Sequence, residues 1–280
     1  VSPRLLLPFE QALGRIEVVE EIASGLAADA ALIFGGDGTV HRHLAGLAAT
    51  QIPLLAVPAG SANDFAWNLG LRTLDVALSA WRKFAAGAAN LRSVDLGVIE
   101  SATEPAAPPI HFCCVAGCGL DAEANRRANA MPRWLRAHGG YKLAALLTIL
   151  LHRSQTVTVT AGGATSGQPE RRLSRPARLV AFGNASTYGG GMRIAPAARL
   201  DDGLLDLCFV SHLGRLRLLR FFPTVMSGRH IGMKEVEYFP TPSLRVETDP
   251  PLEVYADGEP AGHTPILVRA LPRALRVLLP

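Results

Sequence analysis

The sequence predicts two kinds of architecture in one chain, an α/β domain followed by an antiparallel all-β domain. Up to about residue 92, apolar strand-like runs alternate with alanine-rich helical stretches, which indicates a parallel sheet covered by helices. Beyond that point, short β-like runs recur with turn residues between them, as in a β-sandwich. The chain has 280 residues, 49% of them hydrophobic and 19% charged, which is globular material sufficient for both cores.

The expected elements of the first domain alternate along the chain. Strands are expected at residues 15–20, 30–34 and 54–57, and helices at residues 41–49 and 74–86. In the last of these helices Ala77 and Trp81 fall on one face, as in a helix that packs on a sheet. Strand–helix alternation predicts parallel neighbours, because parallel strands need a crossover connection between them.

The expected strands of the second domain are short. They comprise residues 93–99, 110–116, 156–160, 179–183, 205–211, 244–247 and 252–256. Helices are expected in an insert near residues 122–152 and at residues 215–227. A last apolar strand at 275–279 is expected to return to the first domain. We therefore expect residues 1–92, completed by about 268–280, to form the α/β domain, and residues 93–267 to form the sandwich.

Positive charge is concentrated in the middle of the chain. The net charge is +4, but residues 121–193 hold 11 Lys or Arg against 3 Asp or Glu, which gives that stretch alone +8. A basic face can meet nucleic acid, anionic lipid or a phosphorylated substrate, or can serve solubility alone. Residues 126–153 add Trp134, Tyr141 and an apolar run, a composition typical of a segment at a membrane interface. Packing of the apolar run into the core is the alternative.

The cysteines and the apolar stretches favour a cytoplasmic protein. The four cysteines match no zinc-binding spacing and are expected to be buried thiols: Cys113, Cys114, Cys118 and Cys208. No N-terminal stretch combines a basic start, an apolar run and a cleavage site, so we expect no secretory signal. The uncharged residues 43–63 are interrupted by Pro53 and Pro58 and would make a poor membrane-spanning helix.

The strongest local signal is a glycine-rich turn directly after the expected strand at residues 30–34. It reads Gly35-Gly36-Asp37-Gly38-Thr39 and leads into a helix. Glycines let the backbone turn tightly and approach a ligand, and the N–H groups at a helix start attract an anion. A carboxylate is unexpected beside an anion unless a divalent cation or a transferable proton lies between them. A tight turn with a polar tip is the alternative.

A second polar loop follows the expected strand at residues 54–57. It runs from residue 58 to 66 and contains Ser61, Asn63 and Asp64, each of which could also serve only as a helix cap. The carboxyl ends of parallel strands meet at one edge of the sheet, where ligands bind in α/β folds. The two loops therefore predict a common site.

Two further segments combine glycine and acidic residues. Three glycines occupy residues 189–191, and Asp201-Asp202-Gly203 follows. Paired aspartates supply the oxygen ligands that a hard cation takes, although a type I turn is an equal alternative. Asp257-Gly258-Glu259 comes directly after the expected strand at 252–256 and reads by itself as a hairpin turn.

Together these four segments resemble the diacylglycerol kinase catalytic domain family, within the NAD kinase-like superfamily. The family includes bacterial lipid kinases, sphingosine kinases and ceramide kinases, and its motifs occur in the same order. Supporting matches lie at residues 94–97, 117–121 and 272–277. The resemblance covers nearly the whole chain from about residue 16.

The resemblance implies a Rossmann-like α/β nucleotide-binding domain, a β-sandwich domain and an ATP cleft between them. It makes Glu259 the general base and gives Asp37 a catalytic part, with Asp37 and Asp64 holding Mg²⁺-ATP. Asp202, with the backbone carbonyls near Arg199 and Leu204, matches a metal site. Nucleotide contacts are implied for Gly35, Gly36, Asp37, Gly38, Thr39, Val40, His41, Ser61, Asn63 and Asp64.

The function implied is an ATP-dependent lipid kinase that transfers the γ-phosphate to a hydroxyl of diacylglycerol or a related lipid. The implied partners are ATP and a lipid at a membrane surface that the protein visits peripherally; no nucleic acid is expected, and a homodimer is allowed. A soluble NAD kinase-like enzyme is one alternative. An inactive lipid- or nucleotide-binding relative is another, favoured by Arg42 in place of the family's Glu and by the lack of an Asn-Pro loop in residues 1–10.

Overall fold

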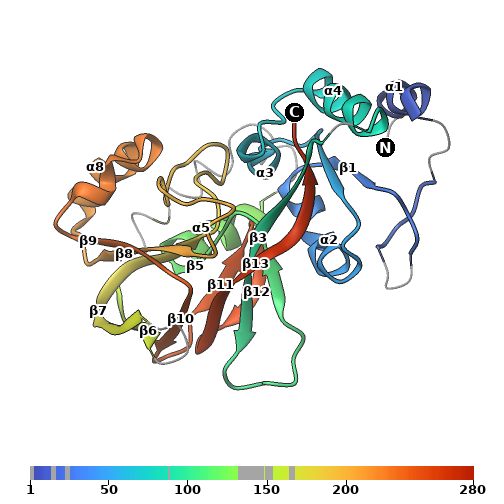
Figure 1. Cartoon of the computed structure of the whole chain (residues 1–280). Helices are drawn as coiled ribbons and strands as arrows, with labels where there is room; N and C mark the ends of the chain where they lie inside the picture. Colours follow the sequence, from blue (N-terminus) through green and yellow to red (C-terminus); the bar gives the residue numbers. More distant parts are fainter. Residues whose placement is uncertain are drawn as a thin grey trace.

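A computed structural model describes residues 3–13, 17–22, 26–87, 89–131, 148, 154–163 and 168–280. Figure 1 shows α1, α4 and both chain termini at one end of the molecule, and β13 running from the large sheet towards that end. The expected helical insert near residues 122–152 lies mostly outside the described residues. Its first part forms α5 (Leu120–Asn129).

The N-terminal part is built on two parallel strands. β1 (Ala31–Gly35) and β2 (Leu54–Pro58) pair with Ala31 opposite Leu54, and α2 (Asp37–Thr50) connects them. The buried residues of α2 are Val40, Leu44 and Leu47, whose spacing of three and four places them on one helical face. The face packs on the sheet and holds the start of α2 at the carboxyl ends of both strands.

Three more helices complete this part. α3 (Asp64–Asn68) and α4 (Leu74–Ala85) follow β2, and α1 (Pro3–Leu13) lies against α4. Thr73 caps α4 by accepting a hydrogen bond from the backbone N–H of Val76. The indole N–H of Trp81 donates to the carbonyl oxygen of Phe9 at 3.3 Å, which joins the two helices.

The C-terminal part is a mixed but largely antiparallel sheet. Its strands are β3 (Leu91–Ser101), β4 (Ile110–Phe112), β5 (Val115–Gly119), β6 (Gln155–Gly163), β7 (Gln168–Gly183), β8 (Leu205–Ser211), β9 (Val236–Thr241), β10 (Ser243–Thr248), β11 (Glu253–Ala256), β12 (Glu259–His263) and β13 (Ile266–Leu278). The main path of neighbours runs β1-β2-β13-β10-β6-β7-β5-β11-β12, with β3 beside β13 and β8 beside β7. Outside the sheet lie α8 (Arg215–Ser227) and the 3₁₀ helix η2 (Arg229–Gly232).

These strands enclose a hydrophobic core of their own. Phe112, Phe182 and Phe209 are fully buried in it, and the rings of Phe112 and Phe182 meet edge to face at 6.1 Å between centroids. Because residues from β3 to β13 contribute to this single cluster, the sheet folds over itself as a sandwich. The expected fold class, α/β followed by an all-β sandwich, is confirmed.

β13 connects the two parts. It pairs antiparallel with β3 and β10, and at its end Val277 lies opposite Leu54 of β2 in parallel. A register shift between Leu271 and Leu275 surrounds Arg273, which has φ 53°. The expected strand at residues 275–279 is therefore the end of a longer strand, which has a bulge in its pairing with β3.

The structure corrects three sequence-based expectations. Residues 17–20 of the expected strand at 15–20 form no strand, and the rest of that segment is outside the described residues. The expected strand at residues 110–116 divides into β4 and β5, because the backbone at Cys113 and Cys114 turns towards another loop. The helix expected at 41–49 begins four residues earlier, so that Asp37 lies in its first turn.

Two observations bear on the cell-biological expectations. No helix among the described residues is both long enough and apolar enough to cross a membrane. All four cysteines are buried and free, as expected from their spacing.

Candidate active site

The two glycine-containing loops lie in direct contact. β1 and β2 end side by side, with Gly35 opposite Pro58, and the N–H of Ala59 donates to the carbonyl oxygen of Gly35 at 3.2 Å. A Cβ on Gly60 would lie 2.4 Å from Cα of Gly36, which is too close for two carbon atoms that are not bonded to each other. The glycines are therefore required for the loops to meet.

Asn63 shapes the second loop from within. Its backbone is in the left-handed region (φ 62°). Its side-chain oxygen accepts from the N–H of Gly60 at 2.8 Å, and its amide group donates to the carbonyl oxygen of Gly60 at 2.9 Å. The side chain of Asn63 thus supports the loop, whereas Ser61 beside it is exposed.

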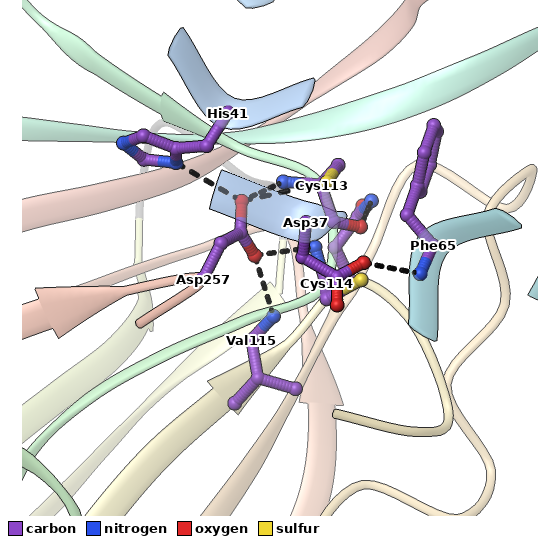
Figure 2. A network of polar contacts seen from close by, with 8 residues as sticks. Asp37, His41, Phe65, Cys113, Cys114, Val115 and Asp257 are labelled. Atoms are coloured by element: carbon purple, nitrogen blue, oxygen red, sulfur yellow. Dashed lines mark hydrogen bonds and ion pairs between the residues drawn. The ribbon is translucent and has the colours of Figure 1, made fainter. Parts of the chain in front are cut away.

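Asp37 joins the first loop to α3. Its carboxylate accepts the backbone N–H of Asp64 at 3.0 Å and of Phe65 at 2.9 Å, as Figure 2 shows for Phe65. A carboxylate at this position satisfies the free amides of the α3 start and suits the positive end of the helix. Thr39 packs over Gly35, and the side chain of Val40 is buried in the core, so only the backbone of Val40 is available to a ligand.

Asp64 connects the N-terminal part to the sandwich. Its side chain is buried, and its two oxygens accept the N–H groups of Gly190 at 2.6 Å and Gly191 at 2.9 Å. Gly189 to Gly191 all have positive φ, which turns successive amides towards one carboxylate. The three-glycine segment therefore holds Asp64 instead of presenting its amides to a solvent-side ligand.

Asp257 is the third buried carboxylate. It has φ 51° in the turn between β11 and β12, and its side chain is fully buried. It accepts the N–H groups of Cys113 and Cys114, both at 2.8 Å, and of Val115 at 3.3 Å. Figure 2 shows these three backbone N–H groups pointing at the Asp257 carboxylate. The sequence predicted only that Asp257 lies in a hairpin turn. The Asp-Gly pair indicated the hairpin, but nothing in it indicated that the carboxylate is buried and bound by backbone amides.

His41 faces Asp257 from α2. Its Nδ1 lies 3.1 Å from Oδ2 of Asp257. Burial lowers the pKa of His41, but the hydrogen bond and charge of Asp257, together with the charge of Glu259, raise it more, so that the pKa lies above its ordinary value. His41 was expected to extend the nucleotide loop, and its ring bridges α2 to the β11–β12 turn.

Glu259 lies against the first glycine loop. It is exposed at the start of β12, two residues after Asp257. A Cβ on Gly38 would lie 2.9 Å from its Oε1 atom, so the carboxylate rests where Gly38 leaves room. The chain thus brings together Gly38 and Glu259, two residues that are far apart in sequence, at the amino end of α2.

The clustered carboxylates shift one another's titration. Burial raises the pKa of Asp37 to about 6; hydrogen bonds from Phe65 and Asp64 lower it, while the charges of Asp64 and Asp257 raise it. Burial also raises the pKa of Asp64. Such concentrated negative charge favours a cation. Each carboxylate oxygen of Asp37 accepts one backbone N–H and keeps a second lone pair, so Asp37 can offer oxygen to a hard ion such as Mg²⁺.

The other expected metal residues lie in a separate turn. Asp202 is exposed, and its carboxylate accepts the N–H of Leu204 at 3.0 Å within the turn. Arg199 pairs with Asp201. The turn is held by buried Asp95, whose N–H donates to the carbonyl oxygen of Leu200 at 2.7 Å and whose carboxylate accepts the N–H of Gly203 at 2.6 Å.

The same carboxylate of Asp95 accepts the N–H of Arg273 at 2.7 Å and so fixes the bulge of β13. This role was not predicted. The only signal was the family-like segment at residues 94–97, which gives the residue type but not its distant partners.

Two buried thiols lie beside Asp257. Cys113, Cys114 and Asp257 bring one sulfur or oxygen atom each within 4.8 Å of the others. Burial raises the pKa of Cys113 far above its ordinary value. The hydrogen bond with Cys113 lowers the pKa of Cys114, but burial raises it to about 12, so both sulfurs stay protonated. In the metal-free protein these protonated thiols surround a carboxylate that already accepts three backbone N–H groups.

A cavity of about 570 Å³ adjoins Asp64 on the side of α3. Its walls are formed by α3 with the residues just after it and by the segment that follows β7: Trp67, Asn68, Arg72, Ser186, Thr187, Gly191 and Arg193. Asn68 donates to Oγ1 of Thr187 at 2.8 Å and accepts from Ser186 at 2.9 Å, which couples the two walls. None of the residues expected to contact a nucleotide lines it.

Gly60→Ala is expected to separate the two loops. The new methyl group would overlap the backbone of Gly36, so we expect a loss of about 1–3 kcal/mol in the free energy of unfolding. Thermal or urea unfolding measures it. Gly232→Ala is the matched control, because a Cβ at Gly232 has nothing within 4 Å. Equal stability of the two variants would show that the loops do not need their close contact.

Comparison with known proteins agrees with this arrangement. The family model "Diacylglycerol kinase catalytic domain" matches residues 7–99, and "YegS C-terminal NAD kinase beta sandwich-like domain" matches residues 114–279. A diacylglycerol kinase of Mycobacterium tuberculosis is 35% identical over 90% of this chain and 77% of its own. A probable YegS-like lipid kinase of Chromohalobacter salexigens is 31% identical over 88% and 74%.

The crystal structure of a putative diacylglycerol kinase from Bacillus anthracis superposes with a TM-score of 0.69 at 25% identity, covering 90% of this chain and 77% of that one. The two family models match the two parts of the chain, a catalytic domain and a β-sandwich-like domain, whose loops meet at the acidic, glycine-lined site. The chain belongs to the diacylglycerol kinase family, together with the YegS-like lipid kinases.

Proposed function

We propose that the protein is an ATP-dependent kinase that transfers the γ-phosphate to a hydroxyl of diacylglycerol or a related lipid. The observation that carries the proposal is the position of the Glu259 carboxylate beside Gly38, at the amino end of α2. A phosphate-binding element and a proton acceptor are the two parts that phosphoryl transfer requires from a protein. The family relationship supports the lipid as acceptor.

The amino end of α2 supplies the phosphate site in this proposal. The backbone N–H groups at the start of α2 would meet the phosphate, and the helix dipole favours negative charge there. Ser61 is exposed on the adjoining loop and can contact the nucleotide through its hydroxyl. We include the backbone of Val40 but assign His41 and Asn63 to positioning, because their side chains bind Asp257 and Gly60.

Asp37 and Asp64 would hold Mg²⁺, and Asp202 with the carbonyl groups of Arg199 and Leu204 would hold a second, structural ion. Bound Mg²⁺ supplies charge neutralisation for the phosphates. Glu259 accepts the proton of the lipid hydroxyl as that oxygen forms a bond to the γ-phosphorus and the bond to ADP breaks. The products are ADP and a phosphorylated lipid.

In this proposal each part of the chain binds one substrate. Residues 1–92 with 268–280 would bind the nucleotide, and residues 93–267 would bind the lipid. Since diacylglycerol resides in bilayers, the protein would act at a membrane surface from the cytoplasm. The contacts of Asp64 with Gly190 and of Asp257 with His41 join the two parts at the site, so the bound nucleotide and lipid would lie close together.

An acceptor assay tests the proposal. Purified protein is given labelled ATP and Mg²⁺ with diacylglycerol, a sphingoid base or NAD as acceptor. We expect label in a lipid product and none in NADP. Turnover of NAD alone would contradict the proposal. Failure to transfer label from ATP to any of the lipid acceptors would contradict it as well.

The reaction is expected to be pH-dependent through Asp37. Its pKa of about 6 exceeds the ordinary value of 3.8, so the carboxylate is charged above pH 6 and neutral below it. At limiting Mg²⁺ the rate should therefore fall as the pH is lowered through about 6. Saturating Mg²⁺ should move the midpoint to lower pH, because bound metal favours the charged form.

Asp37→Asn removes that charge and is expected to weaken use of Mg²⁺-ATP about 10- to 100-fold. Initial rates against Mg²⁺ concentration measure the effect, and a thermal melt checks that α3 is still capped. A variant with the wild-type Mg²⁺ dependence would remove Asp37 from the metal site.

A further inference from the structure

The outer side of α8 is apolar although it faces solvent. The helix buries Leu218, Phe221 and Val225 against the sandwich. On the opposite face Leu216 is 80% exposed, Met226 45% and Leu219 38%. Ile231 of the adjoining η2 is 37% exposed, and η2 contacts α8. We call Leu216, Leu219, Met226 and Ile231 the α8 patch.

The α8 patch lies in an entirely basic segment. Residues 207–234 contain no Asp or Glu and five Lys or Arg: Arg215, Arg217, Arg220, Arg229 and Lys234. Arg217 pairs with Glu235 at 2.6 Å. Arg220, Arg229 and Lys234 are exposed, and no ion pair forms at them within the described part of the chain. Apolar side chains flanked by unpaired cations are the composition of an interfacial helix.

Two hydrogen bonds connect α8 and η2 to a segment that leads to the candidate site. The N–H of Arg193 donates to the carbonyl oxygen of Val225 at 3.1 Å, and buried His230 lies 3.0 Å through Nε2 from the carbonyl oxygen of Ile194. These contacts fasten α8 and η2 to the segment that follows Gly190 and Gly191, whose amides bind Asp64. Figure 1 shows α8 at the end of the molecule opposite α1 and α4.

We propose that the α8 patch docks on the surface of a bilayer that contains anionic phospholipids, with its leucines in the headgroup–acyl boundary and its arginines on the phosphates. The proposal rests on the lipid-kinase function proposed above and names the surface that brings the site to its substrate. It names a membrane contact on α8; the predicted interfacial segment at residues 126–153 lies mostly outside the described residues and stays a separate prediction.

Charge favours a membrane over a second copy of this chain. A two-fold symmetric contact brings the same patch of both copies together, so Arg220, Arg229 and Lys234 would face their own equivalents. An anionic bilayer instead attracts each of these cations and takes up the apolar side chains. Binding should therefore depend on anionic lipid and weaken at high salt.

Sedimentation with vesicles tests the proposal. The full chain is mixed with vesicles of phosphatidylcholine, alone or with one third phosphatidylglycerol. We expect wild-type protein to bind the anionic vesicles and Leu216→Glu/Leu219→Glu to bind them roughly tenfold or more weakly. Leu7→Glu/Leu74→Glu is the matched control, because it changes two exposed leucines on α1 and α4, and it should bind like the wild type.

A second readout separates this proposal from the kinase function. Both double variants should phosphorylate a short-chain diacylglycerol dissolved as monomers at the wild-type rate, and only the α8 variant should lose turnover of vesicle-embedded diacylglycerol.

Three results would overturn the docking proposal. Two of them are wild-type binding that does not depend on anionic lipid, and equal vesicle binding by both double variants. The third is a change from dimer to monomer in the α8 variant, measured by light scattering, without loss of vesicle binding. Absence of kinase activity in the wild type would refute the proposed function while the sedimentation result still stands.

Discussion

Glu259→Gln is expected to abolish phosphate transfer while sparing the fold and nucleotide binding. Glutamine keeps the size of the side chain but cannot accept the proton of the lipid hydroxyl, and loss of a general base lowers kcat by about 10²- to 10⁴-fold. Because Glu259 is exposed and only borders Gly38, no buried contact is lost. The rate of labelled phosphate transfer and the Kd of ATP measure the two halves of this expectation.

Glu253→Gln is the control for that variant. Glu253 is exposed on β11, the other strand of the same hairpin, and pairs with Arg126 at 3.5 Å at the surface. We expect its activity to stay near the wild-type rate, since exposed ion pairs contribute little. Unchanged transfer by Glu259→Gln would exclude Glu259 as the base, and a parallel loss in Glu253→Gln would point to the hairpin's shape instead.

Asp257→Asn is expected to cost about 3 kcal/mol in the free energy of unfolding. The side-chain NH₂ group of asparagine is a donor, and it would face a backbone N–H that now donates to a carboxylate oxygen of Asp257. The negative charge that faces His41 would also be lost. Urea unfolding measures the change. Asp201→Asn, which removes an exposed surface carboxylate paired with Arg199, should change stability by less than about 0.5 kcal/mol.

The same variant carries a pH signature. Burial lowers the pKa of His41 in the folded protein. The hydrogen bond and charge of Asp257, and then the charge of Glu259, raise that pKa above its ordinary value. A raised histidine pKa adds stability that is complete below the unfolded value of about 6.5 and is lost as the pH rises through the folded value. The stability gap between wild type and Asp257→Asn should therefore be larger at pH 5 than at pH 8. A gap that is constant or grows with pH would contradict the His41–Asp257 pair.

Local patterns predicted the elements whose side chains repeat regularly. β8 and α8 have the predicted bounds, because an unbroken apolar run and a helical spacing of leucines leave one interpretation. β9 and β12 were missed, since Pro240, Pro260 and Gly262 are residues that strands usually exclude. α1 was missed as well, because Pro8 interrupts its pattern.

The sequence predicted that the motif loops lie near one another, but it did not predict the hydrogen bonds that join them. The order of motifs indicated Asp37, Asp64 and Glu259, yet it gave no sign that Asp37 binds the amides of α3 or that Asp64 binds those of Gly190 and Gly191. Such contacts join residues 27 and 126 positions apart, and no short-range periodicity encodes them. Asp257 was taken for a turn residue for the same reason.

The proposed reaction depends most on where the triphosphate binds. A crystal structure of the protein with Mg²⁺ and a non-hydrolysable ATP analogue tests this directly. We predict that the terminal phosphate lies at the amino end of α2, over Gly36 and Gly38, with the Glu259 carboxylate facing it. A nucleotide bound elsewhere, such as in the cavity beside Trp67 and Arg193, with Glu259 turned away from its phosphates, would contradict the account.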